Sequence, residues 1–144
     1  MNRLKTLFYF LGVFILTHLG IRILVFFSNR IMDDIPDVIY VPTLGAGLGG
    51  FSVYLASRAA LRITNNYERT RKILWIVLLV PYAMISILGV TQIGFMIYYG
   101  HPLFEFFENV SFSSNPNHWL YNLPYGLSGL YAINLIRKDE LPLD

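Results

Sequence analysis

Apolar residues gather in four long blocks along the chain, and short polar segments separate them. The blocks cover residues 7–27, 39–61, 73–99 and 119–136. A helix needs about 20 mostly apolar residues to cross the hydrocarbon core of a bilayer, because each residue rises only about 1.5 Å. No block alternates apolar and polar residues as a membrane barrel strand does. The pattern therefore predicts an all-α integral membrane protein. We expect an antiparallel bundle of four transmembrane helices in a single membrane domain, residues 1–144.

The positions of lysine and arginine predict the orientation of these helices. Nine of the 11 basic residues precede the first block, flank the second connection or follow the fourth block: Arg3, Lys5, Arg58, Arg62, Arg69, Arg71, Lys72, Arg137 and Lys138. Cytoplasmic loops of membrane proteins are enriched in basic residues. We therefore expect both termini on the cytoplasmic side of a multi-pass protein. The expected location is the plasma membrane, which is the inner membrane in a bacterium.

The loop between the third and fourth blocks is long enough to hold structure of its own. Leu103, Phe104, Phe107 and Val110 recur at helical spacing within it. This pattern predicts a short helix lying in the outer interface.

The same loop contains weak candidates for metal ligands. These are His101, Glu105, Glu108 and His118. Their spacing matches no specific metal-binding signature, and a solvated acidic face of the interfacial helix explains the same residues. No metal or other cofactor is therefore predicted.

Composition narrows the class of protein further. The chain is 55% hydrophobic and 14% charged, against roughly 25% charged residues in soluble domains. It has no cysteine, which excludes disulfides and thiolate catalysis. The net charge of +2 is too small to indicate a nucleic-acid partner. The expected partners are the lipid bilayer and another membrane protein or further copies of the chain.

Polar side chains inside the predicted spans are the first candidates for function. His18 and Arg22 are four residues apart in the first block, so they share a helix face. A charged group costs roughly 2.5–3.5 kcal/mol at the centre of a span on insertion scales. Three interpretations stay open for Arg22: a snorkelling side chain, an ion pair with an acidic outer-loop residue, or contact with an anion. Gln92 and Asn122 are candidates for hydrogen bonds between spans.

Glycines in the second and fourth blocks predict close helix packing. Gly45 and Gly49 form a small-xxx-small pair, Gly50 continues the groove, and Gly126 and Gly129 belong to the fourth block. A formal G-x-G-x-x-G match also occurs in the second block, but it lies inside an apolar helix instead of following a strand, which excludes a dinucleotide site. The groove is expected to receive a helix of this chain or of a partner, with a slight preference for the same chain.

The predicted function rests on these packing surfaces and on the absence of a recognisable catalytic constellation from the sequence. No predicted span contains Asp or Glu, which argues against a membrane aspartyl protease and against a carboxylate-dependent proton antiporter. The leading hypothesis is a non-enzymatic accessory, regulatory or immunity-type subunit that acts by helix–helix contact. One alternative is a small oligomeric channel or carrier for an anionic or polar solute, using His18 and Arg22. A second alternative is a metal- or lipid-handling enzyme at the outer interface.

Overall fold

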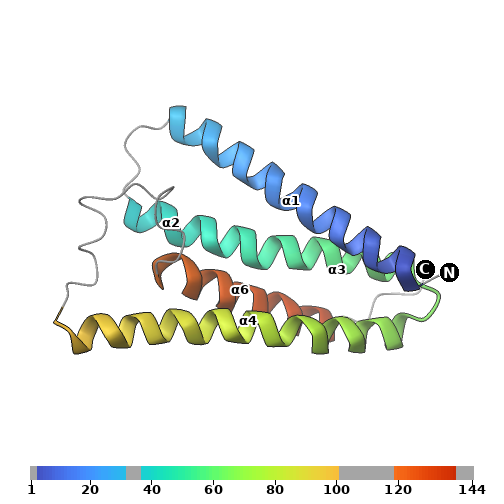
Figure 1. Cartoon of the computed structure of the whole chain (residues 1–144). Helices are drawn as coiled ribbons and strands as arrows, with labels where there is room; N and C mark the ends of the chain where they lie inside the picture. The colour runs from blue at the N-terminus through green and yellow to red at the C-terminus, as the bar shows by residue number, and fades with distance from the viewer. Residues whose placement is uncertain (1–2, 32–36, 101–118, 139–144) are drawn as a thin grey trace.

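The computed structural model describes residues 3–31, 37–100 and 119–138 (Figure 1). These parts are helical with short connections and contain no strand. The helices are α1 (Arg3–Ile31), α2 (Asp37–Ala46), a π-helical turn η1 (Gly47–Phe51), α3 (Ser52–Arg62), α4 (Tyr67–Tyr98) and α6 (Trp119–Lys138).

Three stretches of helix are long and apolar enough to cross a membrane. They are Arg3–Ser28, Ile39–Arg62 and Tyr67–Tyr98, and the second joins α2, η1 and α3. The prediction of an all-α protein with helices long and apolar enough to cross a membrane is therefore confirmed for the residues that the structure describes. α6 has 20 residues but does not join this set, because glycine, proline, asparagine and its terminal basic residues lower its hydropathy. The predicted interfacial helix lies outside the described residues.

Local capping explains why α4 begins earlier than the apolar block predicted. Asn66 precedes the helix, and its Oδ1 accepts a hydrogen bond of 3.2 Å from the backbone N–H of Arg69. Such an N-cap satisfies one of the free donors of the first turn. The helix ends at Tyr98, and Gly100 follows with φ of 68°, a left-handed conformation that terminates helices. Polar first turns of this kind are invisible to a hydropathy criterion.

α6 lies at the centre of the arrangement. It packs against α4 on one side and against α2, η1 and α3 on the other, while α1 packs against α3 (Figure 1). The order of contacting residues shows that α6 runs antiparallel to α4 and parallel to α2 and α3. The start of α1, the end of α3, the start of α4 and the end of α6 share one end of the molecule (Figure 1).

Two groups of buried residues hold the helices together. The larger group joins α3, α4 and α6: Val53, Leu61, Tyr82, Ala132, Ile133 and Ile136. The smaller group places Phe10 of α1 against Ala56 and Ala60 of α3. The small side chains of α3 let α1 approach closely at this end.

α1 leaves the bundle beyond this contact. Phe10 is its only buried residue among the side chains that the structure describes. Farther along, Leu16 and Leu24 are about 70% exposed, and the helix diverges from α2 (Figure 1). Most of α1 therefore presents its apolar surface outward, as a lipid-facing helix does.

Candidate functional site

The glycine groove of the second block is filled by α6 of the same chain. A Cβ built on Gly45 would lie 2.7 Å from the carbonyl oxygen of Tyr121, and one built on Gly49 would collide with the carbonyl of Tyr125. Both obstacles are backbone atoms, which cannot rotate away. The backbones of α2 and α6 thus approach as closely as glycine permits.

The π-helical turn η1 keeps Gly50 in this interface. In a regular α-helix Gly50 would be rotated about 140° from Gly45 around the axis. A π-turn bonds residue i to residue i+5 and so widens the helix locally. Gly50 consequently faces Ser128, whose Cβ would be 3.0 Å from an added Cβ. The sequence predicted the close approach but gave no signal for the π-turn.

Glycines of α6 form a second close interface with α4. A Cβ on Gly126 would clash with Ser86, and a Cβ on Gly129 would clash with the ring of Tyr82. On the α4 side, a Cβ on Gly89 would lie 2.9 Å from the backbone nitrogen of Leu123. α6 therefore makes glycine contacts on two faces. Of the predicted packing residues, Gly45, Gly49 and Gly50 belong to its interface with α2 and η1, and Gly126 and Gly129 belong to its interface with α4.

Gln92 and Asn122 meet across the same interface. Asn122 Nδ2 donates a hydrogen bond of 3.2 Å to Gln92 Oε1, and Asn122 is only 7% exposed. Buried amides require such partners, most of all where no water is present. This pair ties α4 to α6 as part of the helix packing.

His18 reaches α6 through a tyrosine that the sequence analysis did not select. Its Nε2 lies 3.1 Å from the hydroxyl oxygen of Tyr125, and its ring packs on Phe14 with centroids 4.4 Å apart. Tyr125 in turn stacks on Tyr82 of α4, with centroids 5.5 Å apart and planes only 6° from parallel. A continuous series of rings therefore crosses the protein from α1 through α6 to α4.

Arg22 lies one turn beyond His18, on the part of α1 that diverges. Its guanidinium interacts electrostatically with the hydroxyl of Tyr121, and the residue itself is exposed. Arg22 is about 13 Å along the helix axis from the last residue of α1. The acidic residues of the outer loops lie outside the described residues, so an ion pair with them stays a prediction.

Several buried polar atoms near these contacts lack a hydrogen bond within the described residues. They are His18 Nδ1, Tyr82 Oη, Ser52 Oγ and Ser57 Oγ. Two of them, on His18 and Tyr82, belong to the series of rings between α1 and α4. This region therefore has unused hydrogen-bonding capacity at membrane depth.

The metal candidates cannot be placed. His101, Glu105, Glu108 and His118 lie outside the described residues. Within residues 3–31, 37–100 and 119–138, no group of three or more His, Asp or Glu side chains could hold a metal ion.

The tyrosines Tyr82, Tyr121 and Tyr125 are the main residues that sequence analysis overlooked as a site. In the sequence they do not stand apart from their many apolar neighbours. One signal was available, because a phenol hydroxyl inside a span needs a polar partner. Tyr121 and Tyr125 are four residues apart, as are His18 and Arg22, and these two pairs meet in the structure.

In comparisons with known proteins, the chain matches no family model, no curated protein and no solved structure.

Proposed function

We propose that the chain spans the plasma membrane four times, with α6 as the fourth span and both termini in the cytoplasm. The support is the clustering of basic residues at the shared end of α1, α3, α4 and α6, combined with the positive-inside rule. The 20 residues of α6 are enough to cross a bilayer core. Its polar Asn122 is turned inward to Gln92 and away from lipid.

Within that membrane the protein acts by contact, as an accessory, regulatory or immunity-type subunit of another membrane protein. The observation that carries this proposal is the exposed Arg22 on the diverging part of α1. An arginine facing hydrocarbon is costly, by roughly 2.5–3.5 kcal/mol at the centre of a span. A carboxylate offered by a partner helix would offset this cost further than the hydroxyl of Tyr121 does within the chain.

Exposed apolar side chains lie beside Arg22 on α1. Leu19 and Phe26 are within about one turn of Arg22 on the same side of the helix and are 52% and 56% exposed. The glycine groove of α2 and η1 is already occupied by α6. α1 therefore offers a surface of the described chain that another helix can still approach.

The test compares two leucine substitutions at exposed positions. Arg22→Leu removes the charge that the partner would bind, whereas Gly94→Leu adds a leucine on α4, where an added Cβ meets nothing within 4 Å. Each protein is purified from its native membrane in mild detergent, and the associated proteins are quantified by mass spectrometry. We expect a stoichiometric membrane-protein partner with the wild type and Gly94→Leu, and its loss with Arg22→Leu.

Two results contradict this function. One is a wild-type chain that purifies without another protein in stoichiometric amount. The other is equal recovery of the partner with both leucine variants, which would place the contact away from α1.

A second candidate function is an oligomeric channel or carrier for an anionic or polar solute. It is favoured by the position of His18 and Arg22 beside the hydroxyls of Tyr125 and Tyr121, and by the unused hydrogen-bonding capacity of His18 Nδ1. The test is chloride flux into proteoliposomes. Arg22→Leu should abolish the flux and Arg22→Lys should retain part of it. Unchanged flux in an Arg22→Leu protein that inserts normally would rule this candidate out.

A further inference from the structure

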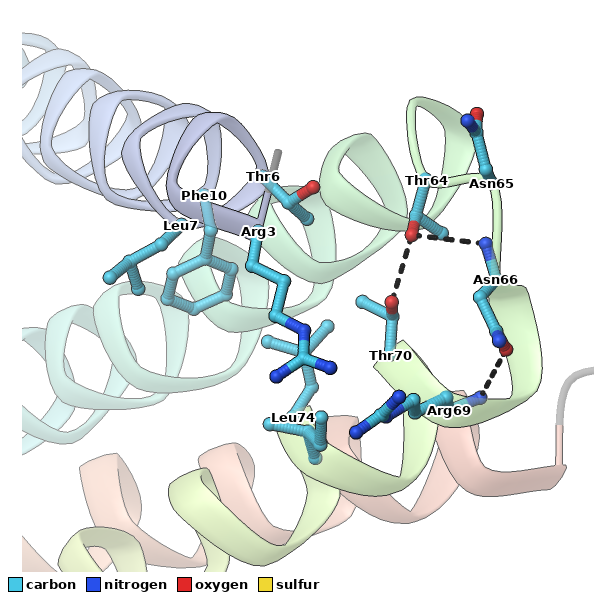
Figure 2. Close-up of a pocket in the computed structure, with 11 residues that line it drawn as sticks. Arg3, Thr6, Leu7, Phe10, Thr64, Asn65, Asn66, Arg69, Thr70 and Leu74 are labelled. Carbon is cyan, nitrogen blue, oxygen red and sulfur yellow. Dashed lines mark hydrogen bonds between the residues drawn. The ribbon is translucent and has the colours of Figure 1, made fainter. Parts of the chain in front are cut away.

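A cavity of about 350 Å³ opens at the end of the molecule where the basic residues gather. It lies between the first turns of α1, the connection from α3 to α4, and the first turns of α4 (Figure 2). Phe10 in its lining stacks on Phe14, which in turn packs on His18. The lining includes neither His18 nor Arg22, so the cavity is separate from the surface proposed above to bind a partner.

Two arginines from different helices extend into this cavity. Figure 2 shows the side chains of Arg3, from α1, and Arg69, from α4, both directed into it. Neither forms an ion pair with a described residue. Glu68, the neighbour of Arg69 in the sequence, is bonded instead to Arg71 at 2.8 Å. Among the described residues, no carboxylate lines this cavity with the two positive groups, and an anion would stabilise such an arrangement.

Other arginines at this end are engaged by the protein itself. Arg71 also donates a hydrogen bond of 3.0 Å to the carbonyl oxygen of Arg137. Arg137 lies over the ring of Trp75, and Arg58 lies over that of Tyr54. By contrast, no ion pair joins the guanidinium group of Arg3 or Arg69 to a residue of the described part of the chain, and both groups line the cavity.

Hydrogen bonds fix the polar wall of the cavity. The hydroxyls of Thr64 and Thr70 are 2.8 Å apart, and the backbone N–H of Asn66 donates to the Thr64 hydroxyl at 3.4 Å. Asn66 also caps α4 through Arg69. The positive end of the α4 dipole therefore faces the same region, and it adds to the attraction of the two guanidinium groups for an anion.

The rest of the lining is largely apolar and comes from the same two helices. It includes Leu7 and Phe10 of α1 and Ile73 and Leu74 of α4, and Phe10 is 7% exposed. A cavity that combines two arginines with apolar side chains suits a ligand with an anionic head and an apolar body. A phospholipid at the membrane surface has this character.

We propose that this cavity binds a phosphate group, held by Arg3 and Arg69. Guanidinium groups bind phosphate oxygens through paired, charge-assisted hydrogen bonds. The phosphate belongs to the headgroup of an anionic phospholipid or to a free phosphate ester, and the apolar wall favours the lipid.

The test compares lipid binding by the wild type with lipid binding by two matched double variants. Arg3→Gln with Arg69→Gln removes both cavity charges, and Lys5→Gln with Lys72→Gln removes two charges from the same helices outside the cavity. Native mass spectrometry of the detergent-purified proteins gives the affinity for phosphatidylglycerol and for phosphatidylcholine. We expect the wild type to prefer phosphatidylglycerol. The arginine pair should weaken that binding about tenfold or more, and the lysine pair less than about twofold.

A further substitution separates binding from folding. Asn66→Asp keeps the capping oxygen of α4 but places a carboxylate at the rim of the cavity. It should leave helicity by circular dichroism unchanged and weaken phosphatidylglycerol binding about as strongly as the arginine pair.

The source of the phosphate is decided in nanodiscs made of phosphatidylcholine alone. Binding of inorganic phosphate there by the wild type, but not by the arginine pair, identifies a free phosphate ligand. Phosphatidylglycerol binding without phosphate binding identifies the lipid headgroup. The proposal is overturned if the wild type binds phosphatidylglycerol no better than phosphatidylcholine and binds no inorganic phosphate. It is also overturned if the arginine and lysine pairs lose phosphatidylglycerol binding equally. Neither result depends on a protein partner, so this test stands apart from that of the proposed function.

Discussion

The imidazole Nε2 of His18 lies 3.1 Å from the phenol oxygen of Tyr125. This contact joins the diverging part of α1 to the central helix α6, beyond the apolar contact that Phe10 makes with α3. It is a hydrogen bond at membrane depth, where water does not compete for either partner. Which group donates depends on the tautomer of the histidine.

Removing this hydrogen bond should loosen α1. We expect His18→Phe and Tyr125→Phe to be coupled by about 0.6 kcal/mol, and by no more than about 1.7 kcal/mol, the range measured for hydrogen bonds between membrane helices. A double-mutant cycle of unfolding free energies in mixed micelles measures the coupling. His18→Phe with Tyr9→Phe, on a tyrosine that is 48% exposed, serves as the uncoupled control. Additive effects of the His18 and Tyr125 substitutions would contradict the assignment.

Gly49 should be the least replaceable residue of the groove. Gly49→Ala forces a methyl group against the carbonyl of Tyr125, and such overpacking costs about 1–3 kcal/mol. Gly47→Ala is the matched control two residues earlier, since its Cβ would meet nothing within 4 Å. We expect the control to be neutral or slightly stabilising, because alanine favours helix over glycine. Equal unfolding free energies for the two variants would show that α2 and α6 are not this close.

Asn122 should tie α6 to α4 through its amide. Asn122→Leu leaves the partner amide of Gln92 short of a donor in a water-poor interface, and we expect a loss of about 1–3 kcal/mol. Gln92→Leu in the same background should restore part of the stability, because the Gln92 oxygen that has lost the Asn122 donor is then removed as well. Unfolding of the single and double variants measures this recovery. A double variant less stable than Asn122→Leu alone would contradict the pairing.

The start of α4 should depend on its cap. Asn66→Ala removes the Oδ1 that accepts from the N–H of Arg69, and losing an N-cap costs about 1 kcal/mol. Asn65→Ala, at the exposed neighbouring residue, is the control. Amide hydrogen exchange should rise in the first turn of α4 for Asn66→Ala alone. Exchange that rises equally in both variants would contradict the capping role.

Hydropathy was sufficient to predict α1, the stretch from α2 to α3, and α4, because these apolar blocks are long and strongly hydrophobic. The block of α6 is interrupted by glycine, proline and asparagine, and only its length predicted a helix. Hydropathy failed at the start of α4, where the first turn is polar and begins at a cap instead of at an apolar residue. The glycine pairs predicted close packing, but spacing alone cannot identify the neighbour. The carbonyls of Tyr121 and Tyr125 identify it only when α6 is in place.

The cavity and the tyrosine contacts could not be predicted from the sequence, for a different reason. Arg3 begins α1, whereas Arg69 lies in the first turn of α4. In the sequence, both residues contribute only to the predicted cytoplasmic cluster of basic residues. Their convergence depends on how α1 packs against α3. Similarly, the meeting of His18 with Tyr125 depends on a helix that is encoded more than 100 residues later.

The central position of α6 has a consequence for biogenesis. Membrane helices enter the bilayer in the order of synthesis, and α6 follows the other described helices in the chain. Until it arrives, the glycine faces of α2 and α4 have no partner from this chain, and His18 has no Tyr125 to bind. The contact of α1 with α3 can form earlier, whereas the interfaces of α6 with α2 and α4 close only in a late step that depends on one 20-residue segment.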